Sequence, residues 1–145
     1  MNDSFKDIGE MVEKIANSVP LVMGVYVDTS IQKESPSSGG LPMHYKYSPK
    51  VTVNTSKSGV FELNTGEEYE SPDQELVRAQ ARCKALELGL EVAKRLNKYE
   101  GAAGATGDND VKVNDLPLDV AVQQLDVYRT ELQRIEADHE GKAWM

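Results

Sequence analysis

A chain of 145 residues is long enough for one domain with an appended element, and 39% apolar residues are enough for a modest core. The net charge of -8 opposes non-specific nucleic-acid binding, because such binding depends on Lys and Arg displacing counterions from phosphates. The single cysteine, Cys83, excludes an internal disulfide and is typical of a reducing, cytoplasmic protein. We expect neither a signal peptide nor a membrane span, because no apolar run approaches the roughly 18 residues that a span requires.

The first predicted element is a helix over residues 4–19. Ser4 followed by Asp7 resembles a capping box with Asp in place of Glu. Pro20 ends the helix, because the residue before a proline avoids the α region. The apolar residues of the segment recur at intervals of three and four, which places them on one helical face: Phe5, Ile8, Val12, Ile15 and Val19.

A group of β-prone segments follows. Runs rich in Val, Ile, Tyr and Thr predict strands at residues 21–31, 43–48, 50–56 and 60–64. Residues 32–42 are rich in Ser, Pro and Gly and predict a flexible loop. Pro49 lies between the second and third runs and, since proline lacks a backbone donor, marks a bulge, an edge or a bend. Together the runs predict a three- or four-stranded antiparallel meander.

The longest helical pattern covers residues 73–98. Pro72 and Asp73 supply start signals, and Glu75 adds a first-turn acid that complements the helix dipole. One apolar face comprises Leu76, Ala79, Cys83, Leu86, Leu90 and Ala93, and the opposite face comprises Val77, Ala81, Ala85, Leu88, Val92 and Leu96. A surface helix needs only one apolar face. We therefore expect one face to cover the sheet and the other to meet another helix, in the same chain or in a second subunit.

A final helix is predicted from about Pro117 to Glu140, after a Gly-, Ala- and Asp-rich linker at residues 100–115. Asp115 is its expected cap, and Gly141 is expected to end it. The helix carries an apolar stripe at seven-residue spacing, to which we assign self-association: Leu118, Leu125, Tyr128, Leu132 and Ile135. Packing of this stripe on the second face of the long helix is an equally weighted alternative.

These elements predict an α+β fold in the order α-β-β-β(-β)-α, with a small antiparallel meander packed on the long helix and a C-terminal amphipathic helix. We divide the chain into a core domain (1–99), a flexible linker (100–115) and the C-terminal helix with its tail (116–145). The order resembles the topology of double-stranded-RNA-binding domains, whose last helix begins with a basic cluster. Asp73 and Glu75 hold that position here, so no family is assigned.

Lys46, Lys50 and Tyr47 are the first candidates for a site that binds phosphate-bearing ligands. They lie in a segment without acids, where basic and aromatic residues alternate. Alternation along a strand places Lys46 and Tyr47 on opposite faces, which favours the structural alternative, an exposed strand protected by its lysines.

Arg78 and Arg82 are the second candidates. They lie one turn apart between the two apolar faces of the long helix, where an unpaired charge is costly. A ligand phosphate would match their guanidinium groups. The favoured structural alternative is an internal ion pair with a carboxylate such as Asp28 or Glu62.

No motif indicates catalysis, a metal or a cofactor. His44 and His139 lie far apart in the sequence, and no cysteine accompanies them at zinc-ligand spacing. The acidic run at residues 67–75 lacks the spacing of a known metal-binding loop. Cys83 has apolar neighbours on its helical face and is expected in the core.

The sequence therefore favours a non-enzymatic, homo-oligomeric binding or adaptor protein of the cytoplasm, a class that includes bacteriophage and bacterial accessory proteins. The alternative is a protein that binds a nucleotide, a phosphorylated small ligand or single-stranded nucleic acid at a subunit interface. That site would consist of Arg78, Arg82, Lys46, Lys50 and Tyr47. No membrane partner is expected.

Overall fold

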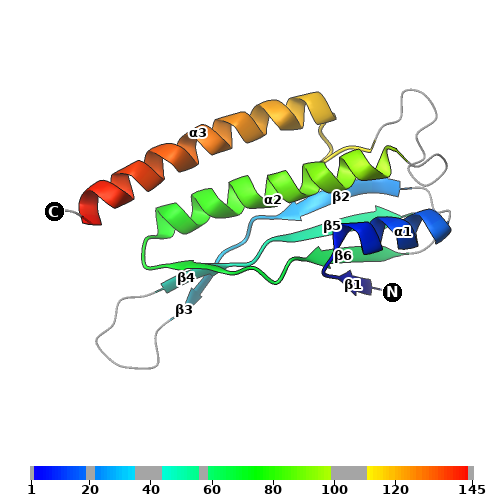
Figure 1. The fold of residues 1–145 in the computed structure, drawn as a ribbon, viewed down its shortest axis with the longest axis horizontal. Helices are drawn as coiled ribbons and strands as arrows, with labels where there is room; N and C mark the ends of the chain where they lie inside the picture. Colours follow the sequence, from blue (N-terminus) through cyan, green and yellow to red (C-terminus); the bar gives the residue numbers. More distant parts are fainter. Residues whose placement is uncertain (1, 19–21, 35–43, 56–58, 99–110, 144–145) are drawn as a thin grey trace.

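The computed structural model describes residues 2–18, 22–34, 44–55, 59–98 and 111–143. The strands are β1 (Asn2–Phe5), β2 (Val22–Asp28), β3 (Gln32–Glu34), β4 (His44–Tyr47), β5 (Lys50–Thr55), β6 (Val60–Asn64) and β7 (Tyr69–Ser71). The helices are α1 (Ile8–Ser18), α2 (Gln74–Leu96) and α3 (Leu118–Ala143). The predicted α+β class is confirmed. The long helix α2 lies on the sheet, and the C-terminal helix α3 lies on the outer side of α2 (Figure 1).

The strands form two sheets where the sequence predicted a single meander. The larger sheet has the order β1-β6-β5-β2, and the smaller has the order β3-β4-β7. β1 runs parallel to β6, with Phe5 opposite Leu63, whereas the other strand pairs are antiparallel. Pro49 is buried between β4 and β5, which belong to different sheets. This proline has no N–H for a ladder, so it suits the point where the chain passes from one sheet to the other.

The N-terminal segment differs from its prediction. Helix α1 begins at Ile8, and residues 2–5 form a strand, so Ser4 is not the cap. The Asp7 carboxylate caps the helix instead, because its Oδ1 accepts hydrogen bonds from the backbone N–H groups of Gly9 (2.7 Å) and Glu10 (3.2 Å). Phe5 still reaches the core, but from a strand, with its ring centroid 6.0 Å from that of Phe61.

Helix α2 begins as predicted. The Asp73 carboxylate accepts from the N–H groups of Glu75 (3.1 Å) and Leu76 (3.3 Å). Both predicted apolar faces are used, because α2 packs on both sheets and on α3. Gly89 marks the closest approach of α2 to β2, since an added Cβ would lie 2.5 Å from Cγ1 of Val27.

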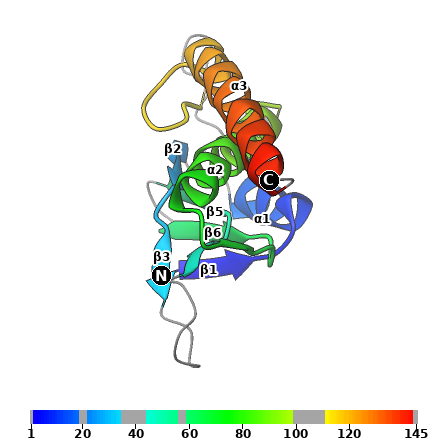
Figure 2. The same cartoon turned by 90° about the vertical axis from the view of Figure 1, so that its left-hand side faces the viewer.

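Helix α3 packs on α2 of the same chain (Figure 2). Three residues of the predicted stripe, Leu125, Leu132 and Ile135, are buried together with Ala121, and the other two, Leu118 and Tyr128, are partly buried. Ion pairs flank this contact, including Arg129 Nε to Glu87 Oε1 at 3.1 Å and Arg134 Nη2 to Glu75 Oε1 at 3.7 Å. The predicted end at Gly141 is wrong, because the helix continues to Ala143.

A tight turn joins α3 to the edge of β2. Val113 and Leu116 exchange backbone hydrogen bonds of 3.1 and 2.9 Å. The two residues between them, Asn114 and Asp115, have φ values of 52° and 66°, the left-handed conformation that Asn and Asp tolerate better than most residues. Asp115 therefore belongs to this turn and is not the predicted helix cap. Val113 is fully buried, so the end of the segment predicted as a linker contributes to the core.

Candidate functional site

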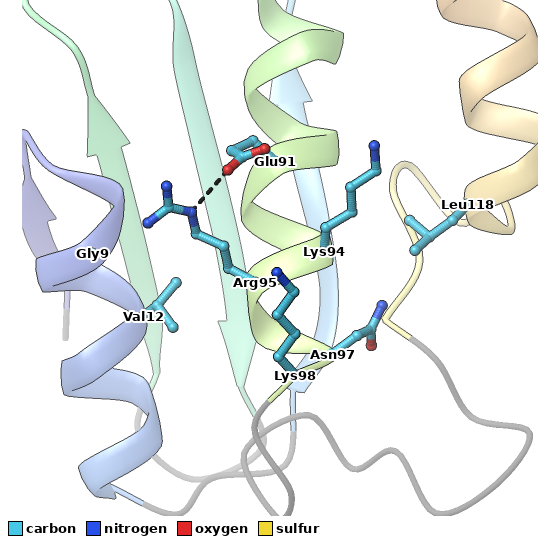
Figure 3. Close-up of a pocket in the computed structure, with 8 residues that line it drawn as sticks. All are labelled: Gly9, Val12, Glu91, Lys94, Arg95, Asn97, Lys98 and Leu118. Carbon is cyan, nitrogen blue, oxygen red and sulfur yellow. Dashed lines mark hydrogen bonds and ion pairs between the residues drawn. The ribbon is translucent and has the colours of Figure 1, made fainter.

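A basic groove of about 640 Å³ crosses the C-terminal half of α2, between α1 and the start of α3 (Figure 3). Its volume falls within the range of roughly 300–1,000 Å³ that is typical of small-molecule sites. The residues that line it are Gly9, Val12, Glu91, Lys94, Arg95, Asn97, Lys98 and Leu118.

Three cations and one carboxylate give the basic groove its charge. Arg95 Nε lies 2.9 Å from Glu91 Oε1, so this pair is neutralised. Lys94 and Lys98 form no ion pair with any described residue. Lys94 lies in the last turn of α2 and Lys98 lies two residues after the end of the helix, so two like charges repel each other at this end of α2. A bound anion would remove this repulsion, although both lysines also complement the negative end of the helix dipole.

The framework of the basic groove is fixed by the core beneath it. The inward side of α2 here consists of Val92, Ala93 and Leu96, which are all fully buried. The Asn97 Oδ1 accepts a hydrogen bond of 2.8 Å from the N–H of Val111, which holds the end of α2 against the segment before α3. The groove is therefore present without rearrangement of the backbone.

The residues that α1 and α3 contribute to the basic groove are apolar, whereas those contributed by the end of α2 are charged or polar. Gly9 on α1 has no side chain and leaves that wall open, while Leu118 at the start of α3 is partly buried and forms the facing wall. Figure 3 shows Arg95 extending toward α1 and Lys94 extending toward the α3 side. An anionic ligand with an apolar part would contact charge and hydrocarbon in the same groove.

The lining of the basic groove is rich in cations and poor in other reactive side chains. Among its described lining residues, the one carboxylate, Glu91, is already paired with Arg95, and none is a histidine, cysteine, serine or threonine. Elsewhere in the described part of the chain, no group of three His, Cys, Asp or Glu side chains could hold a metal ion.

The first predicted candidates lie elsewhere. Lys46, Tyr47 and Lys50 together line a cavity of about 250 Å³ where the two sheets separate. Three carboxylates surround Lys46 Nζ: Glu34 at 3.0 Å, Glu68 at 3.8 Å and Glu70 at 4.0 Å. This arrangement makes Lys46 the centre of a surface ion-pair network and disfavours a phosphate there.

Tyr47 points into the protein. It is 2% exposed, and its hydroxyl donates a hydrogen bond of 3.0 Å to the backbone carbonyl of Asp28. Burial, with the nearby Asp28 carboxylate, raises its pKa well above the usual value for tyrosine. Its ring stacks on that of Tyr69, with centroids 6.5 Å apart, so it is a core residue and not a platform for a base.

The second predicted candidates lie one turn apart on α2 and differ in their surroundings. Arg78 is exposed on α2, whereas Arg82 lies beside α3 with its Nη1 4.0 Å from Glu131 Oε1. The partner of Arg82 is therefore Glu131 and neither of the anticipated carboxylates, Asp28 and Glu62. Arg82 lines a cavity that also includes Tyr128, and the structure does not bring it together with Lys46, Tyr47 and Lys50.

The residues predicted to carry self-association face α2. Their burial within one chain corresponds to the intramolecular alternative, and self-association stays a prediction.

Comparison with known proteins finds no matching family model, no matching curated protein and no matching solved structure. Within the described residues, no helix has the length and apolarity needed to cross a membrane.

Proposed function

We propose that this protein is a non-enzymatic binding protein for a small phosphate-bearing ligand, which it holds in the basic groove. The observation that carries the proposal is the position of Lys94 and Lys98. They lie one turn apart in a ligand-sized groove without an acidic partner among the described residues, in a chain whose net charge is -8.

A phosphate suits these groups better than a neutral ligand does. Two lysines provide six N–H donors with no acceptor of their own, and each charge-assisted hydrogen bond contributes roughly 1.5–3 kcal/mol. Arg95 would add a planar donor set once the ligand competes with Glu91. The surrounding negative charge of the protein opposes an anion at long range, so binding depends on short-range contacts and is sensitive to salt.

The described lining residues include no histidine, cysteine, serine or threonine, and their one carboxylate is paired with Arg95, which supports reversible binding in preference to catalysis. A ligand such as a nucleotide would place its phosphates on Lys94 and Lys98 and its apolar part near Leu118. This proposal keeps the phosphate-binding function that the sequence suggested as its alternative and moves the site to different residues.

Thermal shift assays with the full chain test the proposal. Pyrophosphate, AMP and ATP are added at low and high salt, since a ligand that binds the native state raises the melting temperature by mass action. The Lys94→Gln/Lys98→Gln double variant is expected to weaken binding at least about tenfold. Lys33→Gln is the matched control. Lys33 is exposed on β3 of the smaller sheet and does not line the basic groove.

Two outcomes would contradict the proposal. The first is no thermal shift with any of the three phosphates at low salt. The second is equal binding by the wild type and the Lys94→Gln/Lys98→Gln variant.

A further inference from the structure

We propose a second, independent binding site, for a small carboxylate, in the cavity beside Arg82. This Arg82 cavity has a volume of about 220 Å³ and lies between α2, α3, the end of β2 and the turn before α3. The polar side chains that line it are Thr29, Arg82, Asn114, Gln124 and Tyr128.

Arg82 is the cation of this cavity. Its interaction with Glu131 is an ion pair at 4.0 Å, which is too long for a hydrogen bond, and it forms no hydrogen bond with another described residue. A guanidinium group carries five N–H donors in a planar fork. Arg82 is therefore a cation whose donors are still available, and its side chain is 41% exposed.

Residues with further donors line the same cavity from other elements. The Oδ1 of Asn114 accepts from the N–H of Val27 at 3.1 Å, which leaves the NH₂ of the same amide without a described partner. Gln124 and Tyr128, both on α3, likewise form no side-chain hydrogen bond with a described residue. Two helices and a turn thus place donors without a described protein partner around one cation.

The remaining lining residues indicate the size and chemistry of the ligand. Val27, Leu86 and Leu116 give the cavity an apolar side. The planar guanidinium matches a carboxylate through two parallel N–H···O bonds. The cavity is about a third of the volume of the basic groove, so we assign to it a small organic acid with a short hydrocarbon part.

Glu131 is the charged group that faces Arg82 from α3. It competes with any ligand carboxylate for the guanidinium. Removal of its charge by Glu131→Gln should therefore tighten carboxylate binding, whereas a purely structural role of Arg82 predicts no such gain.

The full chain is titrated with acetate, succinate and benzoate. Binding is measured by calorimetry and by NMR amide chemical shifts. We expect saturable binding of at least one acid, with shifts centred on residues 114–128. Arg82→Gln should weaken binding at least about tenfold, and Arg82→Lys should weaken it because a lysine lacks the fork. Arg78→Gln is the matched control, since Arg78 is exposed one turn away on the same helix.

Some outcomes would overturn the proposal. They are no saturable binding of the three acids to the wild type, equal loss in Arg78→Gln and Arg82→Gln, or no tightening in Glu131→Gln. Because the basic groove and the Arg82 cavity share no lining residue, Lys94→Gln/Lys98→Gln should leave carboxylate binding unchanged, so the two proposals fail separately.

Discussion

The Tyr26 hydroxyl donates a hydrogen bond of 2.8 Å to the Asp115 carboxylate, across 89 positions of the sequence. This contact links β2 to the turn that positions α3. The same hydrogen bond, with some burial, raises the pKa of the Tyr26 phenol, because ionised Tyr26 would lose the bond and meet a negative charge.

Tyr26→Phe is expected to lower the free energy of unfolding by roughly 0.5–1.5 kcal/mol, the net value of a hydrogen bond. Urea denaturation measures the change. Tyr45→Phe is the control, because no described residue accepts a hydrogen bond from the Tyr45 hydroxyl. Equal stability of the Tyr26→Phe variant and the wild type would show that the contact contributes nothing.

Substitutions at Asn114 separate backbone conformation from hydrogen bonding. Asn114→Ala should cost roughly 1–2 kcal/mol for the left-handed conformation, plus the loss of the bond from the Val27 N–H. Asn114→Gly keeps the conformation and loses only the bond, so the expected order of melting temperatures is wild type, then Gly, then Ala. A variant Asn114→Ala more stable than Asn114→Gly would contradict the turn geometry.

Gly89→Ala tests the close approach of α2 to β2. The added methyl group would lie 2.5 Å from Val27 Cγ1, so we expect a loss of roughly 1–3 kcal/mol in unfolding free energy even though alanine is the better helix former. Combining Gly89→Ala with Val27→Ala should cost less than the sum of the two single losses. Additive losses would show that the two sites are not in contact.

Leu132 and Val127 compare the two sides of α3. The Leu132 side chain lies on the side of α3 that packs on α2 and is 7% exposed, whereas Val127 is 63% exposed. Leu132→Ala should therefore lower stability by roughly 2–5 kcal/mol, and Val127→Ala should change it by no more than about 0.5 kcal/mol. Light scattering on the same variants measures assembly. A lower mass in Leu132→Ala, at unchanged stability, would favour the self-association predicted from the sequence over packing within one chain.

Alkaline pH should destabilise the fold through its tyrosines. Burial and the hydrogen bond to Glu67 raise the pKa of Tyr69 to about 12, above the ordinary value of about 10. A raised tyrosine pKa means that the native state favours the neutral phenol. The resulting stability is complete below pH 10 and is lost progressively between about pH 10 and 12. Denaturation at stepped pH measures the loss, which should be smaller in Tyr69→Phe.

Local signals account for the parts of the fold that were predicted well. The alternation in residues 60–64 defines β6 with its observed bounds, and Asp73 caps α2 because the start signal is confined to one turn. Strand β1 was missed because the spacing of Phe5 and Ile8 also fits a helix. Its partner β6 lies far along the chain, and no local pattern identifies that parallel pairing.

The candidate sites were predicted less well, for a related reason. Lys94, Arg95 and Lys98 are cations at the end of a helix, a common arrangement that complements the dipole. Only the positions of α1 and α3 convert them into a groove. Arg82 was recognised as a candidate, but its partner Glu131 is on another helix, and ion pairs between distant segments leave no sequence spacing to detect.

The parallel pairing of β1 with β6 also has a consequence for synthesis. Phe5 leaves the ribosome long before Leu63, so the first strand must wait, without its partner, until most of the sheet has been translated. During that interval the edge of β6 does not yet exist, and of the elements that contact α1 in the native structure only β1 has been made. Closure of the larger sheet on the nascent chain therefore cannot precede the synthesis of residue 64, although its first strand is made at the start of translation.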